Sequence, residues 1–125
     1  MNCLGNYLVT LSFYTTLGFT SIVRVLGDKK DFDPVFSSLD KSSTLFKDVQ
    51  SIIDNLKNNV LVGQRIKFEK IPKYYKKRHG VDNAFHVYLP EGMRLVYSIT
   101  IHQGKKTAFL MELTDHKNYE QRFNY

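Results

Sequence analysis

The sequence has little that would support a disulfide-bonded or metal-centred protein. Its single cysteine, Cys3, excludes an internal disulfide framework and cannot form a structural zinc site alone. The chain has no glycine-rich phosphate loop and no Gly-x-Ser-x-Gly nucleophile motif. Its histidines are scattered, without neighbouring carboxylates at metal-ligand spacing: His79, His86, His102 and His116. We therefore expect a protein that folds in the cytoplasm and uses no metal and no cofactor.

Charge is absent from the first 23 residues, yet these residues do not read as a membrane span. Hydroxyl side chains interrupt the apolar run, and no basic residue precedes it as in a secretory signal. The density of Tyr, Phe, Thr and Val instead predicts two strands, over residues 6–14 and 19–26. A membrane anchor is the weaker alternative, and we expect no membrane partner.

The positive charge is concentrated in one stretch. The net charge is +6, and residues 65–78 contain seven basic residues and one acid, so the other residues are balanced at eleven of each sign. Such a concentration favours a surface that binds a polyanion or an acidic protein over a solvated charge run. The predicted RNA-binding residues are Arg65, Lys67, Lys70, Lys73, Lys76 and Arg78.

Two helices are predicted before this stretch. Asp33-Pro34 is typical of a helix start, with an aspartate cap and proline at the first helical position, and this helix should end near Leu39. Ser42 and Ser43 should cap a longer helix that ends near residues 58–59. Its apolar positions follow helical spacing: Leu45, Val49, Ile52, Ile53 and Leu56. We expect a helical hairpin packed on a sheet.

The C-terminal half predicts a three-strand antiparallel meander. Alternation of apolar and polar residues marks strands over 84–89 and 94–102, and a third covers 107–113, with turns around Pro90-Glu91-Gly92 and Gly104. Residues 64–70 should be extended and 73–78 should form a helical turn. Asp115 should cap a terminal helix that runs to about residue 123.

Arg94 is the most informative single residue. It follows a turn and begins a strand, and its side chain must leave the face opposite Leu95 and Tyr97. A guanidinium on a rigid sheet suits recognition of a phosphate. An arginine that extends to solvent from a strand end is an equally good reading of the pattern alone.

Several other side chains have a structural and a functional interpretation. Tyr97 is expected in the core. His86 could line a groove, although an ordinary surface histidine is the more common outcome. Tyr74 and Tyr75 could stack on bases beside the lysines, or one could pack and the other be exposed.

The segment Gly92-Met93-Arg94-Leu95-Val96-Tyr97 resembles the Gly-x-Arg-Leu-x-Tyr segment of the RelE/ParE toxin superfamily. The order of the surrounding segments is also similar, and the His116-Lys117-x-Tyr119 stretch with an aromatic terminus resembles the archaeal-type RelE-like branch. The similarity runs from about Phe19 to the end, so a single domain of residues 19–125 is expected. Residues 1–18 are interpreted as an extension, or as the result of an early start codon.

The resemblance implies an α+β fold with a two-helix hairpin on one face of the sheet and a concave catalytic face on the other. It implies a toxin that cleaves messenger RNA at the ribosome, without a metal, by attack of the ribose 2′-hydroxyl. Arg94 would stabilise the charged phosphorane, with His116 and Tyr119 as the other catalytic residues. An acidic antitoxin would hold the toxin inactive.

The terminus lacks the arginine cluster of the best-known RelE proteins, and no carboxylate is evidently placed as a base. Two alternatives therefore stay open beside the ribonuclease. One is a catalytically silent or ParE-like relative that binds a protein, such as DNA gyrase. The other is a plain RNA-binding module that uses the basic stretch.

Overall fold

The computed structural model describes residues 24–123. Its elements are β1 (Arg24–Gly27), α1 (Asp33–Ser37), α2 (Thr44–Lys57), β2 (Gln64–Arg65), the 3₁₀ turn η1 (Phe68–Lys70), α3 (Lys73–His79), β3 (Phe85–Tyr88), the 3₁₀ turn η2 (Pro90–Gly92), β4 (Arg94–His102), β5 (Lys105–Thr114) and α4 (His116–Phe123). The predicted strand over residues 6–14, the 1–18 extension and the membrane-anchor alternative all lie outside the described residues.

The strands form one five-stranded mixed sheet in the order β1-β5-β4-β3-β2. β1 is parallel to β5, and the other neighbouring pairs are antiparallel. The chain is thus an α+β protein with a C-terminal β4–β5 hairpin and a short terminal helix. Among the helices of residues 24–123, none is long and apolar enough to cross a membrane.

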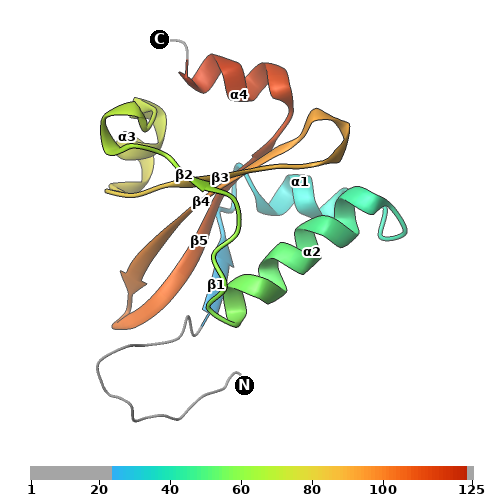
Figure 1. The fold of residues 1–125 in the computed structure, drawn as a ribbon, viewed down its shortest axis with the longest axis horizontal. Helices are drawn as coiled ribbons and strands as arrows, with labels where there is room; N and C mark the ends of the chain where they lie inside the picture. The colour runs from blue at the N-terminus through green and yellow to red at the C-terminus, as the bar shows by residue number, and fades with distance from the viewer. Residues whose placement is uncertain (1–23, 124–125) are drawn as a thin grey trace.

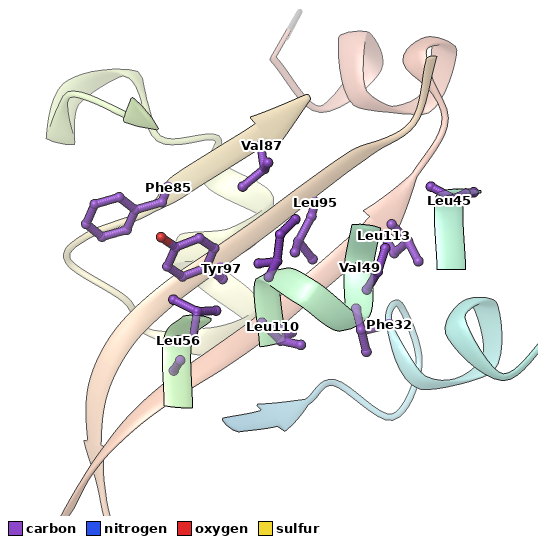
Figure 2. Packing of buried hydrophobic residues seen from close by; sticks show 12 residues of the cluster. Phe32, Leu45, Val49, Leu56, Phe85, Val87, Leu95, Tyr97, Leu110 and Leu113 are labelled. Carbon is purple, nitrogen blue, oxygen red and sulfur yellow. The ribbon is translucent and has the colours of Figure 1, made fainter. Parts of the chain in front are cut away.

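Figure 1 shows α1 and α2 together on one side of the sheet and α3 and α4 on the other. The larger core lies on the α2 side of the sheet, where the apolar residues of the helix pack against those of β3, β4 and β5 (Figure 2). Val49, Leu56, Leu95 and Tyr97 are completely buried there. The two predicted helices are present and both lie on this side of the sheet (Figure 1), and the predicted core position of Tyr97 is confirmed.

The second face of the sheet, where the resemblance implies a concave catalytic face, also carries packed helices (Figure 1). A smaller apolar cluster lies under α3 and α4, and it consists of Ile66, Ile71, Tyr75, Ala84, Val96, Met111 and Tyr119. The members from the covering segments, Ile66, Ile71, Tyr75 and Tyr119, stand among charged and polar residues, so they form no periodic pattern that would predict a covering helix.

An irregularity in β5 determines which side chains reach this second cluster. Val96 pairs with Glu112 while the next residue, Tyr97, pairs with Leu110, so Met111 is an extra residue in the ladder. Such a bulge places two consecutive residues on one side of the sheet. Met111 and Glu112 both contribute to the α3–α4 side, and Leu110 and Leu113 both pack on the α2 side.

Two details of the predicted elements were wrong. Phe32, not Asp33, is the N-cap of α1, and Asp33 is its first residue, with its backbone N–H donating to the Asp28 carbonyl at 2.8 Å. The extended segment 64–70 is a strand only at its first two residues. Ile66 N–H still bonds to the Ala84 carbonyl at 2.9 Å, and the chain then turns into η1.

Candidate active site

Arg94 lies where the β3–β4 turn meets the sheet. It pairs with Tyr88 on one side and with Thr114 on the other. The turn depends on left-handed backbone at Glu91 and Gly92, with φ of 61° and 72°. Antiparallel partners point to the same face, so Arg94 and Tyr88 project together on the α4 side, away from α2.

Aromatic rings and an imidazole surround the Arg94 guanidinium. Its centre lies 4.3 Å from the Tyr88 ring centroid and 5.7 Å from that of Tyr119. Nη2 is 3.3 Å from His116 Nδ1, and Nη1 donates to the Met93 carbonyl at 3.1 Å. Nε is buried and has no hydrogen-bond partner. The guanidinium is thus oriented by ring faces, with donor capacity remaining for an oxyanion.

α4 brings His116 and Tyr119 to Arg94. Asp115 caps the helix as predicted, because its Oδ1 accepts the Asn118 N–H at 2.9 Å. Tyr119 is buried in the cluster under α4, whereas His116 is exposed. The structure therefore brings together all three residues that the sequence proposed as catalytic.

A buried carboxylate fixes α4 on the sheet. Glu112 accepts two bonds from Arg122 of α4, from Nε to Oε1 and from Nη2 to Oε2, both at 3.1 Å. Its Oε1 also accepts the Tyr75 hydroxyl of α3 at 2.6 Å. The bidentate geometry limits rotation of α4, and so it sets the position of Tyr119 one turn away.

His86 belongs to this group, although the sequence favoured an ordinary surface position for it. Its Nδ1 forms a short hydrogen bond with the Tyr119 hydroxyl, and the two rings lie nearly parallel, 6.0 Å apart. The Tyr88 ring contacts the His86 ring edge-on at 5.2 Å. The sequence feature that could have predicted this position is the alternation of side chains along the strand, which puts His86 and Tyr88 on the same face as Arg94.

Burial and the arginine charge set the protonation states of the site. Burial lowers the pKa of His86, and the positive charge of Arg94 lowers that pKa further. Burial raises the pKa of Tyr119 to about 12, with the neighbouring Tyr88 also raising it and Arg94 opposing the shift. At neutral pH the site therefore holds a neutral imidazole hydrogen-bonded to a protonated phenol, beside a permanent cation.

The basic stretch does not form one continuous surface beside Arg94. Arg78 is held by two aspartates, with Nη2 at 3.1 Å from Asp28 and Nε at 3.6 Å from Asp31. Arg65 pairs with Phe85 and lies over its ring at 5.7 Å, toward the α2 side. The exposed basic side chains nearest η1 along the chain are Lys67, Lys70 and Lys73, while Lys76 lies over the Phe68 ring.

A cavity of about 330 Å³ lies beside Arg65, and Arg94 does not line it. Its walls are Leu61, Arg65, Asp82, Asn83, Phe85, Ile99 and Lys106. The Asn83 side-chain amide already forms two hydrogen bonds with the backbone of Ile99: its Nδ2 donates to the carbonyl, and its Oδ1 accepts the N–H. The group around Arg94 carries a better case for chemistry than the cavity, because it combines a cation, an imidazole and a phenol, whereas no histidine or tyrosine lines the cavity.

Within residues 24–123, no group of three or more His, Cys, Asp or Glu side chains could hold a metal ion. The arrangement around Arg94 can bind a phosphate through the guanidinium. It can also move a proton between His86 and Tyr119, or through His116. Comparison of the chain with protein-family models, curated proteins and solved structures finds no match.

Proposed function

We propose that this chain is a toxin-type endoribonuclease of the RelE/ParE superfamily, which cleaves messenger RNA at the ribosome and is neutralised by an acidic antitoxin in the cytoplasm. One observation carries the proposal. The Arg94 guanidinium projects from the start of β4 into a group formed by Tyr88, His116 and Tyr119. The α+β fold, with paired helices on one face and an antiparallel β3–β4–β5 meander, supports it.

The reaction is an intramolecular transfer at phosphorus. The ribose 2′-oxygen loses its proton to a base and attacks the adjacent phosphorus, and the bond to the 5′-oxygen of the next nucleotide breaks. The products are a 2′,3′-cyclic phosphate and a 5′-hydroxyl. Because the nucleophile is tethered beside its target, catalysis needs positioning, proton transfer and charge stabilisation.

Each side chain has a role that suits its protonation state. Arg94 binds the non-bridging phosphate oxygens and stabilises the charge that develops on the phosphorane. An imidazole accepts the 2′-hydroxyl proton, and the two candidates are His86, whose lowered pKa keeps it neutral at neutral pH, and the exposed His116. The protonated Tyr119 hydroxyl donates to the leaving 5′-oxygen, which its raised pKa permits at neutral pH.

One observation favours a non-cleaving relative as the second candidate. His86 and the Tyr119 hydroxyl are hydrogen-bonded to each other, so a substrate that uses either group must first displace this hydrogen bond. A protein with this site closed would bind RNA or a protein partner and form no product.

The test uses the purified full-length chain and ribosomes engaged on a messenger RNA. We expect cleavage that persists with EDTA and leaves 2′,3′-cyclic phosphate and 5′-hydroxyl ends. Arg94→Ala should lower the rate at least ~100-fold. Lys47→Ala, which changes an exposed side chain of α2, should leave the rate unchanged. Equal cleavage by wild type and Arg94→Ala would remove the proposed site. Absence of cleavage by wild type would leave the non-cleaving candidate.

A further inference from the structure

Phe68 is a large apolar side chain that the fold leaves in solvent. It lies in η1 with 57% of its surface exposed, between the exposed lysines Lys67 and Lys70. The Lys76 ammonium of α3 lies over its ring at 4.2 Å from the centroid. A single exposed apolar residue is ordinary on a protein surface, but an exposed ring among cations is a specific chemical combination.

The backbone holds this ring in a fixed position. Ile66 and Ile71, on either side of η1, are both buried in the cluster beneath α3 and α4. Within the turn, Lys70 N–H bonds to the Lys67 carbonyl at 2.8 Å, and Ile71 N–H bonds to that of Phe68 at 3.2 Å. Because both ends are anchored, Phe68 is presented to solvent by a rigid turn, and ordering it on binding costs little entropy.

The Phe68 turn and the Arg94 group flank the same apolar cluster. Ile66 and Ile71 anchor the turn in that cluster, and Tyr119, which contacts Arg94, is buried in it as well. The Tyr88 ring at the Arg94 group is 63% exposed. The α3–α4 side of the sheet therefore presents two exposed rings, each with a cation against it.

We propose that Phe68 is a stacking platform for an unpaired RNA base, with Lys67 and Lys70 binding the neighbouring phosphates, separate from the Arg94 group. A base presents a flat π-face to the ring and the strand presents its charge to the lysines. A duplex would satisfy the lysines but would keep its base faces stacked internally. An acidic protein would likewise use the lysines without a requirement for an aromatic ring. The inference rests on the proposed function for the identity of its ligand as RNA.

The protein contains no tryptophan, so Phe68→Trp introduces a unique fluorescent reporter into the full-length chain. The probe is a single-stranded 2′-O-methyl oligoribonucleotide, which has no free 2′-hydroxyl and cannot be cleaved. We expect the oligonucleotide to quench this tryptophan by stacking. Ile101→Trp, in the β4–β5 hairpin where Ile101 is 69% exposed, is the matched control and should show no quenching. Duplex RNA and poly-glutamate should leave both signals unchanged.

The ring requirement is checked by affinity. Phe68→Leu keeps an apolar side chain without a π-face, and should weaken binding of the same oligonucleotide by roughly 5- to 100-fold, the range for one base–aromatic stack. Phe68→Tyr should bind like wild type. Equal affinity of Phe68→Leu and wild type, or quenching by poly-glutamate, would overturn the proposal, and so would the absence of oligonucleotide binding by wild type.

The stacking proposal and the ribonuclease proposal can fail independently of each other. If wild type cleaves RNA through Arg94 and Phe68→Leu binds normally, the stacking platform is wrong and the ribonuclease stands. If the 2′-O-methyl strand binds through Phe68 and unmodified RNA is never cleaved, the platform stands and the ribonuclease is wrong.

Discussion

The Arg94 guanidinium lies 4.3 Å above the ring of Tyr88, its direct partner across the β3–β4 pair. The Arg94 side chain is thus aligned by a ring carried on the neighbouring strand. Within residues 24–123 no carboxylate forms a salt bridge with this arginine, so its positive charge remains effective toward a phosphate.

Loss of the Tyr88 ring should impair cleavage through the orientation of Arg94. Tyr88→Leu removes a cation–π contact of about 0.5–2 kcal/mol, which corresponds to a rate loss of about 2- to 30-fold. Tyr88→Phe keeps the ring and should retain the wild-type rate. Single-turnover cleavage measures this, and thermal melting should be nearly unchanged because Tyr88 is exposed. A Phe variant as slow as the Leu variant would assign the effect to the hydroxyl.

The hydroxyl of Tyr119 should matter for chemistry more than for folding. Tyr119→Phe preserves the ring in the apolar cluster and should lower single-turnover cleavage by roughly 100-fold, the usual contribution of a positioned acid. With its pKa at about 12, this acid stays protonated, so the wild-type rate should not decline between about pH 7 and pH 9. A decline in that range, absent from Tyr119→Phe, would contradict the assignment.

The titration of His86 should report the Arg94 charge directly. Burial and Arg94 both lower the His86 pKa, so Arg94→Gln should raise it toward the usual value without reaching it, because burial remains. The pKa of His79 is also lowered by burial, and Arg94 is not among its causes, which makes it an internal control. NMR titration of the imidazole protons measures both. An equal shift of the two histidines would indicate a general structural change.

The contributions of Glu112 and Arg122 to the unfolding free energy should be coupled, because the two side chains form an ion pair with a buried carboxylate. Arg122→Leu leaves a buried carboxylate without its main partner and should cost about 2–4 kcal/mol of unfolding free energy. Adding Glu112→Leu to this variant should restore part of the loss, since the unpaired charge is removed. Urea denaturation of the single and double variants gives the coupling. Additive losses would show that the pair is not coupled.

Acid stability should depend on Asp28. Burial would raise its pKa, but hydrogen bonds from the Asp31 and Lys30 amides and from Arg78 outweigh burial and hold the pKa below its usual value. A lowered folded-state pKa stabilises the fold above the unfolded-state value, and this contribution is lost as the pH falls through the folded-state pKa. Asp28→Asn should therefore lower unfolding free energy at pH 7 by about 1–3 kcal/mol and flatten its decrease below about pH 4. Asp48→Asn, on α2, should do neither.

The C-terminal half of the fold follows from local sequence. Strict alternation and the two turns fixed the bounds of β4, and Ser43 marked the start of α2 through the bond that Phe46 N–H donates to its hydroxyl. The covering of the second face was not predictable in this way. Tyr75 and Tyr119 are buried by contacts with residues distant in sequence, although each stands in a short helix rich in charged and polar residues.

The candidate site was predictable to a similar extent. Arg94, His116 and Tyr119 came from the family resemblance, and the structure places them together. Alternation carried the information for Tyr88 and His86, but only the contact with Tyr119 distinguishes His86 from a surface residue. The commitment of Arg78 to Asp28 joins residues fifty positions apart, and no local pattern in the basic stretch could reveal it.

The extra residue at Met111 determines on which side of the sheet the chain leaves β5. If β5 kept a regular pleat through Met111, the alternation after Leu110 would be inverted, so Glu112 would enter the α2 core and Leu113 would turn outward. The helix that follows would then start on the wrong side, carrying His116 and Tyr119 away from Arg94. Assembly of the group around Arg94 therefore depends on the local irregularity that accommodates one unpaired residue in β5.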